Sequence, residues 1–165
     1  MSSENEWLWL QERPANVVAD DFYFTGILTP RSTDNPLGSN ITSVNVETFP
    51  GLNTLGMGRS DFASGGVNPP HVHHPRASEL LMVLEGTLLV ELVSSNQNGN
   101  RVFSKAVNKG DVFLIPQGMA HFQKNIGDGN NAVGISKPLA ANSQEFTQLI
   151  LLCLIILHLK FLLMI

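Results

Sequence analysis

Cysteine is almost absent from this chain of 165 residues, which contains only Cys153. One cysteine cannot form an intramolecular disulfide framework or supply the paired thiolates of a structural zinc site, so any bound metal ion must be held by histidine and carboxylate side chains. Charged residues are also scarce, at 15%, and 14 Asp and Glu outnumber 10 Lys and Arg. With a net charge of −4 there is no surplus of positive charge to neutralise phosphates, and the sequence predicts no nucleic-acid partner.

The chain is long enough for one domain with a hydrophobic core and too short for two ordinary ones. Residues 1–15 have neither the basic start nor the long apolar stretch of a secretory signal, and we interpret them as a divergent N-terminal segment. The composition changes again near Phe146. We therefore expect one domain over residues 16–145 and an apolar tail over residues 146–165.

Residues 149–165 are apolar except for His158 and Lys160. Seventeen residues are at the short limit for crossing a bilayer, which takes roughly 20, and the lysine could reach an interface. The tail is therefore interpreted as a membrane anchor, as a buried helix or strand, or as a translated stretch foreign to the fold. The sequence predicts no other membrane contact.

Short apolar runs separated by Gly, Pro, Asn and Asp clusters are typical of many strands and few helices, and they predict an all-β sandwich or barrel. The expected strands are residues 22–28, 43–49, 54–62, 79–84, 87–93, 102–107, 111–115, 120–125 and 132–136. Residues 94–101 contain Asn-Gly and Gly-Asn steps and are expected to form a hairpin loop. Gly86 and Gly118 are expected at turns. The predicted core residues are Leu80, Leu81, Val83, Leu88, Val90, Val112 and Leu114.

Four of the five histidines lie in two short stretches, GGVNPPHVHHPRASELLMVLEG and GDVFLIPQGMAHFQKN. His71 and His73 would share one face of an extended strand, because residues two apart point the same way. A hairpin-like return through Pro75 would bring the Glu79 carboxylate beside them. His121, at the head of a later strand, can face the same interior of a rolled sheet. These four residues predict a metal site.

The two stretches resemble the two sequence boxes of the cupins, and more narrowly those of the plant germin-like proteins. The first box, G-x5-H-x-H-x(3 or 4)-E-x6-G, is similar to the stretch from Gly65 to Gly86, and the second, G-x5-P-x-G-x2-H-x3-N, is matched from Gly110 to Asn125. The resemblance covers about residues 16–144. The one departure is that five residues separate His73 from Glu79, so that counting back from Glu79 would select His74. We prefer His73, because an extra residue is absorbed more easily in a turn than in a strand. Asn125 is interpreted as structural.

The resemblance implies a cupin jelly-roll β-barrel in which His71, His73, Glu79 and His121 bind Mn(II). Implied activities are superoxide dismutation and, in true germins, oxidation of oxalate, with a small-molecule substrate in either case. A non-enzymatic cell-wall, receptor-like or storage cupin is the alternative from another class. Oxalate-oxidising members carry two pocket asparagines; Asn68 fits the first, but Gly58 replaces the second. Dismutation is therefore favoured over oxalate oxidation.

Germin-like proteins are typically secreted to the extracellular matrix, the apoplast, and form homo-oligomers. They have a signal peptide, an N-terminal disulfide and a C-terminal region that completes the barrel, and this sequence lacks the first two and replaces the third. We therefore expect an extracellular family member truncated at both ends, with a barrel incomplete at its C-terminal end. The sequon Asn40-Ile41-Thr42 is a hint of a secreted glycoprotein.

Overall fold

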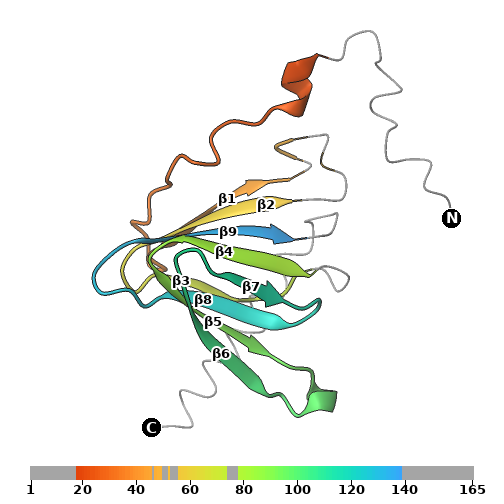
Figure 1. The fold of residues 1–165 in the computed structure, drawn as a ribbon, viewed down its shortest axis with the longest axis vertical. Coiled ribbons are helices and arrows are strands. Elements are labelled where there is room, and N and C mark those ends of the chain that lie inside the picture. Colours follow the sequence, from red (N-terminus) through yellow and green to blue (C-terminus); the bar gives the residue numbers. More distant parts are fainter. Residues whose placement is uncertain (1–17, 46, 50–51, 53–55, 74–77, 139–165) are drawn as a thin grey trace, which may run out of the picture.

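The structure is a computed structural model that describes residues 18–45, 47–49, 52, 56–73 and 78–138. Nine strands and two short 3-10 turns make up the regular structure of these residues (Figure 1). In chain order they are η2 (Ala19–Phe22), β1 (Ser39–Val44), β2 (Met57–Phe62), β3 (Val67–His71), β4 (Glu79–Glu85), β5 (Thr87–Val93), η3 (Asn96–Asn98), β6 (Val102–Asn108), β7 (Val112–Ile115), β8 (Ala120–Asn125) and β9 (Ala132–Pro138). The all-β prediction is confirmed.

The strands form two antiparallel sheets, which we call sheet A and sheet B. Sheet A has the order β1-β2-β9-β4-β7, and sheet B has the order β3-β8-β5-β6. In Figure 1 the two sheets face each other and enclose a common interior. Consecutive strands repeatedly change sheet, since β3 lies in sheet B, β4 in sheet A and β5 in sheet B again. This alternation brings residues that are close in sequence to opposite walls of the interior.

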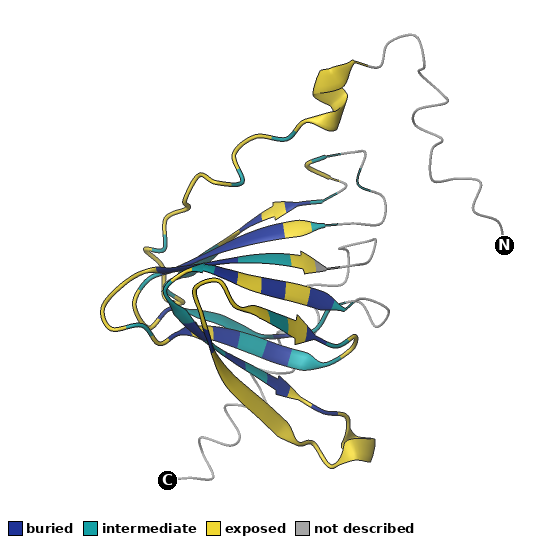
Figure 2. Ribbon diagram, in the orientation of Figure 1, coloured by how far each residue is buried: buried dark blue, intermediate teal, exposed yellow. Residues whose placement is uncertain are grey.

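The hydrophobic core lies between the two sheets. Buried and exposed residues alternate along β4, as Figure 2 shows, because successive side chains of a strand point to opposite faces. The core consists of Phe62, Leu81, Val83, Leu88, Val90, Val107, Ile115 and Ala132, with Phe113 packed against it. The prediction that Leu80, Val112 and Leu114 belong to the core is wrong. They are 43%, 59% and 56% exposed, because their positions in the alternation place them on the outer face of sheet A.

The largest differences between the expected strands and the structure are in three places, and most other limits shift by one or two residues. Residues 22–28 form no strand; Phe22 ends η2, and Gly26 has a φ of +97°, which breaks an extended run. The strand expected at 43–49 is instead Ser39–Val44, where it pairs with β2. The extended strand expected to carry both His71 and His73 is β3, but it ends at His71, so His73 lies beyond it. Pro69 and Pro70 remove two backbone donors from β3, and its position at the edge of sheet B accommodates them.

The turn predictions are confirmed. Gly86 between β4 and β5 has a φ of +75°, and Gly118 has a φ of +70°, both in the left-handed region that favours glycine. Residues 94–101 connect the paired strands β5 and β6 through η3, with Gly99 and Asn100 at positive φ. Within the described part of the chain, no helix combines the length and apolar character needed to cross a membrane.

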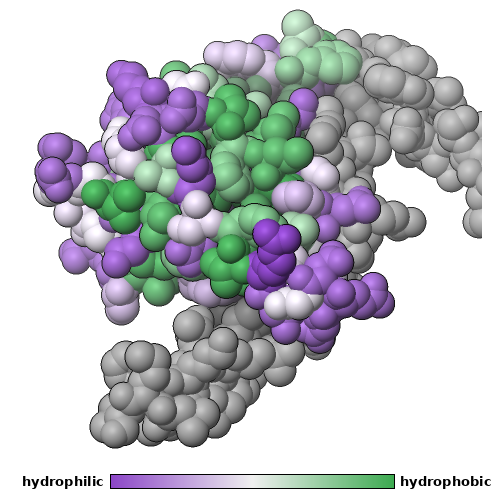
Figure 3. Space-filling view, turned by 60° about the horizontal axis from the view of Figure 1, so that its bottom comes forward, coloured by the Kyte–Doolittle hydropathy of each residue, from purple (hydrophilic) through white to green (hydrophobic). Residues whose placement is uncertain are grey.

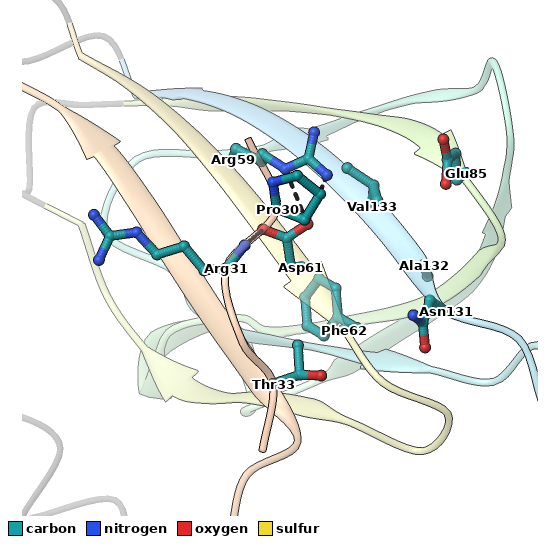
Figure 4. Close-up of a pocket in the computed structure, with 10 residues that line it drawn as sticks. All are labelled: Pro30, Arg31, Thr33, Arg59, Asp61, Phe62, Glu85, Asn131, Ala132 and Val133. Atoms are coloured by element: carbon teal, nitrogen blue, oxygen red, sulfur yellow. Dashed lines mark hydrogen bonds and ion pairs between the residues drawn. The ribbon is translucent and has the colours of Figure 1, made fainter. Parts of the chain in front are cut away.

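The segment before β1 crosses the outer face of sheet A and is fixed there by a buried ion pair. Arg59 Nε and Nη2 donate to Asp61 Oδ1 at 2.9 and 2.7 Å, and the backbone N–H of Arg31 donates to Asp61 Oδ2 at 3.1 Å. A pocket of about 130 Å³ lies beside this pair, bounded by Pro30 and Thr33 of the segment (Figure 4). Since both Asp61 oxygens accept hydrogen bonds from the protein itself, the pair attaches the segment to the sheet.

Candidate metal centre

Three strands from both sheets position the four predicted site residues. His71 is the last residue of β3, His121 is the second residue of β8, and Glu79 is the first residue of β4. His73 follows β3 by two residues. One donor atom from each of the four lies within 4.8 Å of the others. The structure therefore brings all four side chains together. His74 lies outside the described residues, so the preference for His73 over His74 stays a prediction.

The two buried histidines, His71 and His121, are register partners in the antiparallel pairing of β3 with β8. Side chains of directly opposed residues lie on the same face, and their ring centroids are 4.2 Å apart. The ring of His73 lies 5.1 Å from each of the other two. The three imidazoles thus form a compact triangle at one end of the interior.

Glu79 reaches this triangle by a different route from the one expected. A hairpin-like return would pair β3 with β4, but β4 belongs to sheet A and pairs with β7 and β9. The hairpin prediction is wrong. Strands β3 and β4 lie in opposite walls of the interior, so the Glu79 carboxylate faces the histidines across it. The proximity of Glu79 to the three histidines therefore depends on how sheet A and sheet B pack against each other.

Backbone carbonyls orient two of the rings. His71 Nδ1 lies 2.8 Å from the carbonyl oxygen of Pro69, and His121 Nδ1 lies 2.9 Å from that of Met119. A carbonyl only accepts hydrogen bonds, so each Nδ1 must carry the proton and donate it. Each Nε2 is then left with its lone pair, which is the tautomer that a metal-binding histidine requires.

The Nε2 atoms converge on the carboxylate. His121 Nε2 lies 3.3 Å from Glu79 Oε2, and His73 Nε2 also contacts this oxygen. Glu79 Oε2 and His121 Nε2 are buried and make no hydrogen bond within the described residues. Two lone pairs directed at each other repel, and burying polar groups without partners is costly, unless a cation lies between them. The donor set therefore fits a metal ion.

The surroundings of His71 and Glu79 favour their metal-binding forms at neutral pH. Burial, followed by the nearby imidazole of His121, lowers the pKa of His71 from 6.5 to about 4. Burial alone would raise the pKa of Glu79, but the adjacent imidazoles of His121 and His73 outweigh it and hold the pKa below its usual range. At pH 7 His71 is thus neutral and Glu79 ionised, the forms in which these residues bind metal ions.

Gln123 is a buried neighbour of the site that the sequence analysis did not single out. Its Oε1 accepts a 2.7 Å hydrogen bond from Asn68 Nδ2 across the β3–β8 pairing. Gln123 is only 3% exposed and lies two residues after His121, so both side chains point to the same face of β8. This two-residue spacing was the available signal, and it would have placed Gln123 beside the metal donors.

Comparison with known proteins identifies the family to which this chain belongs. The sequence profile of the cupin family matches residues 25–151. Germin-like protein 1-1 of Oryza sativa subsp. japonica is 53% identical over 121 residues, which are 72% of this chain and 54% of the relative. Germin-like protein subfamily 1 member 7 of Arabidopsis thaliana is 56% identical over 119 residues, 71% of this chain and 52% of the relative.

A solved structure supports the same assignment. A recombinant oxalate oxidase in complex with glycolate superimposes with a TM-score of 0.73 at 37% identity, over 78% of this chain and 64% of that one. The chain belongs to the cupin family, and among cupins to the germin-like proteins, with the jelly-roll fold that the sequence resemblance implied. It spans about half the length of the curated relatives it matches.

Proposed function

We propose that this germin-like cupin binds manganese through His71, His73, Glu79 and His121 and catalyses superoxide dismutation. The observation that carries the proposal is the convergence of three imidazoles and one carboxylate, whose donor atoms all lie within 4.8 Å of one another. Three nitrogen donors and one oxygen donor leave two positions open on a six-coordinate ion. The open positions suit a small oxygen species.

Manganese, when bound, would supply one-electron redox chemistry by alternating between two oxidation states. Through their Nδ1 hydrogen bonds, the carbonyls of Pro69 and Met119 hold the rings of His71 and His121 in place. Glu79 supplies the one negative charge among the donors and is 3% exposed. By affinity alone the site would prefer Cu, Ni or Zn, so the metal supplied during assembly determines which ion is bound.

The interior near β2 favours superoxide over oxalate. Position 58, where the oxalate-oxidising relatives are expected to carry asparagine, is glycine here, and even a Cβ at this position would lie 3.1 Å from Ser136 Oγ. The remaining pocket amide is that of Asn68. It donates a hydrogen bond to Gln123, so this donor is already engaged within the protein. A substrate the size of oxalate would therefore lose the amide it needs, whereas superoxide needs only the open metal positions.

We place this activity in the plant extracellular matrix. The germin-like relatives are plant proteins, and the sequon Asn40-Ile41-Thr42 permits glycosylation during secretion.

The test is elemental analysis of the purified chain after loading with Mn(II), with superoxide and oxalate assays in parallel. His121→Ala removes one donor from a strand that otherwise keeps its pairing, and we expect loss of both bound manganese and dismutase activity. Lys124→Ala is the matched control, because Lys124 lies on the same strand and is exposed on the opposite face.

Unchanged metal content in folded His121→Ala would refute the ligand assignment. Oxalate-dependent formation of peroxide above the dismutase rate would refute the choice of substrate. A folded, manganese-loaded wild type with neither activity would instead support a non-enzymatic cupin.

A further inference from the structure

A polar side chain outside the donor group lies on the interior wall formed by sheet A. Hydrophilic residues are ordinary on the molecular surface, where Figure 3 shows them around an apolar area on one face. Ser136, the fifth residue of β9, is instead half-buried in the wall. The buried amides of Gln123 and Asn125 are hydrogen-bonded, but the Ser136 hydroxyl forms no hydrogen bond with another described residue. It is therefore a donor available to a ligand.

The register of β9 with its two neighbours fixes the direction of this side chain. Ser136 is the partner of Gly58 on β2 and of Leu81 on β4. Directly opposed residues share a face of the sheet, and Leu81 is a core residue that is 2% exposed. A Cβ at Gly58 would lie 3.1 Å from Ser136 Oγ, so the hydroxyl occupies the space beside the glycine on this face. Ser136 thus points into the interior between the sheets.

The same register places Ser136 beside one of the metal donors. Glu79 lies two residues before Leu81 on β4, so both side chains point to the interior. Ser136 is then the diagonal neighbour of Glu79 across the β4–β9 pairing, a separation of about 7–8 Å. Because Ser136 is half-buried rather than enclosed, a small molecule bound next to Glu79 can reach the hydroxyl, directly or through one water molecule.

We propose that the Ser136 hydroxyl donates a hydrogen bond to a small anion held at an open position of the metal ion. This inference rests on the proposed function, which makes that anion an oxygen species, and it adds a residue that recognises it. A hydroxyl is uncharged, so it stabilises an anion without competing with the imidazoles and the carboxylate for the metal. Gly58, on the neighbouring strand, offers no longer side chain, so the wall presents one short donor, which suits a small anion.

The test is the affinity of azide for the manganese-loaded full-length protein, followed by the EPR spectrum of Mn(II). Azide is a small anion that binds without turnover, so the measurement does not depend on dismutase activity. Ser136→Val and Ser136→Thr form a matched pair, because their side chains have nearly the same shape, both suit a strand, and only threonine keeps the hydroxyl. We expect Ser136→Val to weaken azide binding about tenfold, as for loss of one hydrogen bond to a charged group, and Ser136→Thr to bind azide like the wild type.

Ser60→Ala is the positional control. Ser60 lies on the same interior wall but pairs with Gly134, one strand and two residues farther from Glu79 than Ser136, so this variant should keep the azide affinity of the wild type. Elemental analysis should find equal manganese in every variant. Loss of manganese from Ser136→Val would overturn the inference, because the hydroxyl would then serve the metal site itself.

Equal azide affinity in Ser136→Val and the wild type would also overturn the inference, and so would a manganese-loaded wild type that binds no azide. An equal loss in Ser60→Ala would overturn it too, because the effect would not be specific to the position beside Glu79. A dismutase assay of the same samples tests the proposed function separately. The expected order of azide affinities without superoxide turnover would support the role of Ser136 and refute the proposed activity.

Discussion

Asn125, the last residue of β8, joins the loop between β2 and β3 to the loop between β8 and β9, and its substitution offers a sharp test of the fold. Its side chain is 1% exposed. Nδ2 donates to the carbonyl oxygens of Ala63 at 2.9 Å and Asn130 at 2.7 Å, while Oδ1 accepts from the N–H of Gly127 at 2.9 Å. The identity of these partners fixes the orientation of the amide, because carbonyls require donors and an N–H requires an acceptor.

Asn125→Ala removes all three hydrogen bonds and leaves their partners poorly satisfied. At about 1 kcal/mol for each net hydrogen bond, we expect the free energy of unfolding to fall by about 3 kcal/mol. For a chain of this size that corresponds to a decrease in Tm of about 6–12 °C. Chemical denaturation and thermal melting of the metal-free protein measure both quantities. Folded Asn125→Ala should still bind manganese, because Asn125 is not one of the donors.

Asn125→Asp is the more discriminating variant because it has almost the same shape. One carboxylate oxygen can still accept from Gly127, but the other would face the two carbonyl oxygens in a buried site. We expect this variant to be at least as destabilised as Asn125→Ala at pH 7, and to recover part of the difference from wild type when acid protonates the carboxylate. Asn108→Ala, which removes one exposed 3.1 Å hydrogen bond from Thr87, should cost less than about 0.5 kcal/mol. Wild-type stability of Asn125→Asp at pH 7 would refute this reasoning.

Two further predictions concern acid and a tight turn. Because the pKa of His71 is about 4 in the folded metal-free protein and 6.5 in the unfolded chain, the unfolded chain binds more protons between these values. Stability should therefore be fully present above pH 6.5 and fall by about 3 kcal/mol as the pH decreases to 4. The lowered pKa of Glu79 adds to this loss below about pH 4.5. A denaturation midpoint unchanged between pH 7 and pH 4 would contradict the prediction. Gly86 and Gly99 both have positive φ, but a Cβ at Gly86 would lie 2.7 Å from that of Ala132, whereas one at Gly99 would meet nothing within 4 Å. Gly99→Ala should cost about 1 kcal/mol of backbone strain and Gly86→Ala about 3 kcal/mol, because the second adds overpacking; equal melting temperatures would show that the contact is unimportant.

The strand limits were predicted best where turn residues bound a strand on both sides. The limits of β5 and β8 agree with the sequence prediction, since each is bounded by turn residues. The same reasoning failed for residues 22–28, which are apolar enough for a strand but have no neighbouring strand to pair with. Pairing is a tertiary event, and no local pattern reports it.

The core shows a second limit of prediction from the sequence, which concerns the face of a strand that is buried. Leu80 and Leu81 are chemically identical neighbours, yet one is 43% exposed and the other 2%. When both faces of a strand carry apolar residues, the period-two pattern separates the faces but does not say which of them is covered. Only the packing of sheet B against sheet A decides this.

The sequence by itself determined which side chains are available to a metal ion, whereas the strand face expected to carry both His71 and His73 ends at His71. The available side chains follow from the sequence because imidazole and carboxylate chemistry is a local property. Tertiary structure alone decided that Glu79 reaches the histidines from the opposite sheet and that Leu80, Val112 and Leu114 face outward. Both depend on which walls of the interior meet, and that is settled by contacts between residues far apart in the chain.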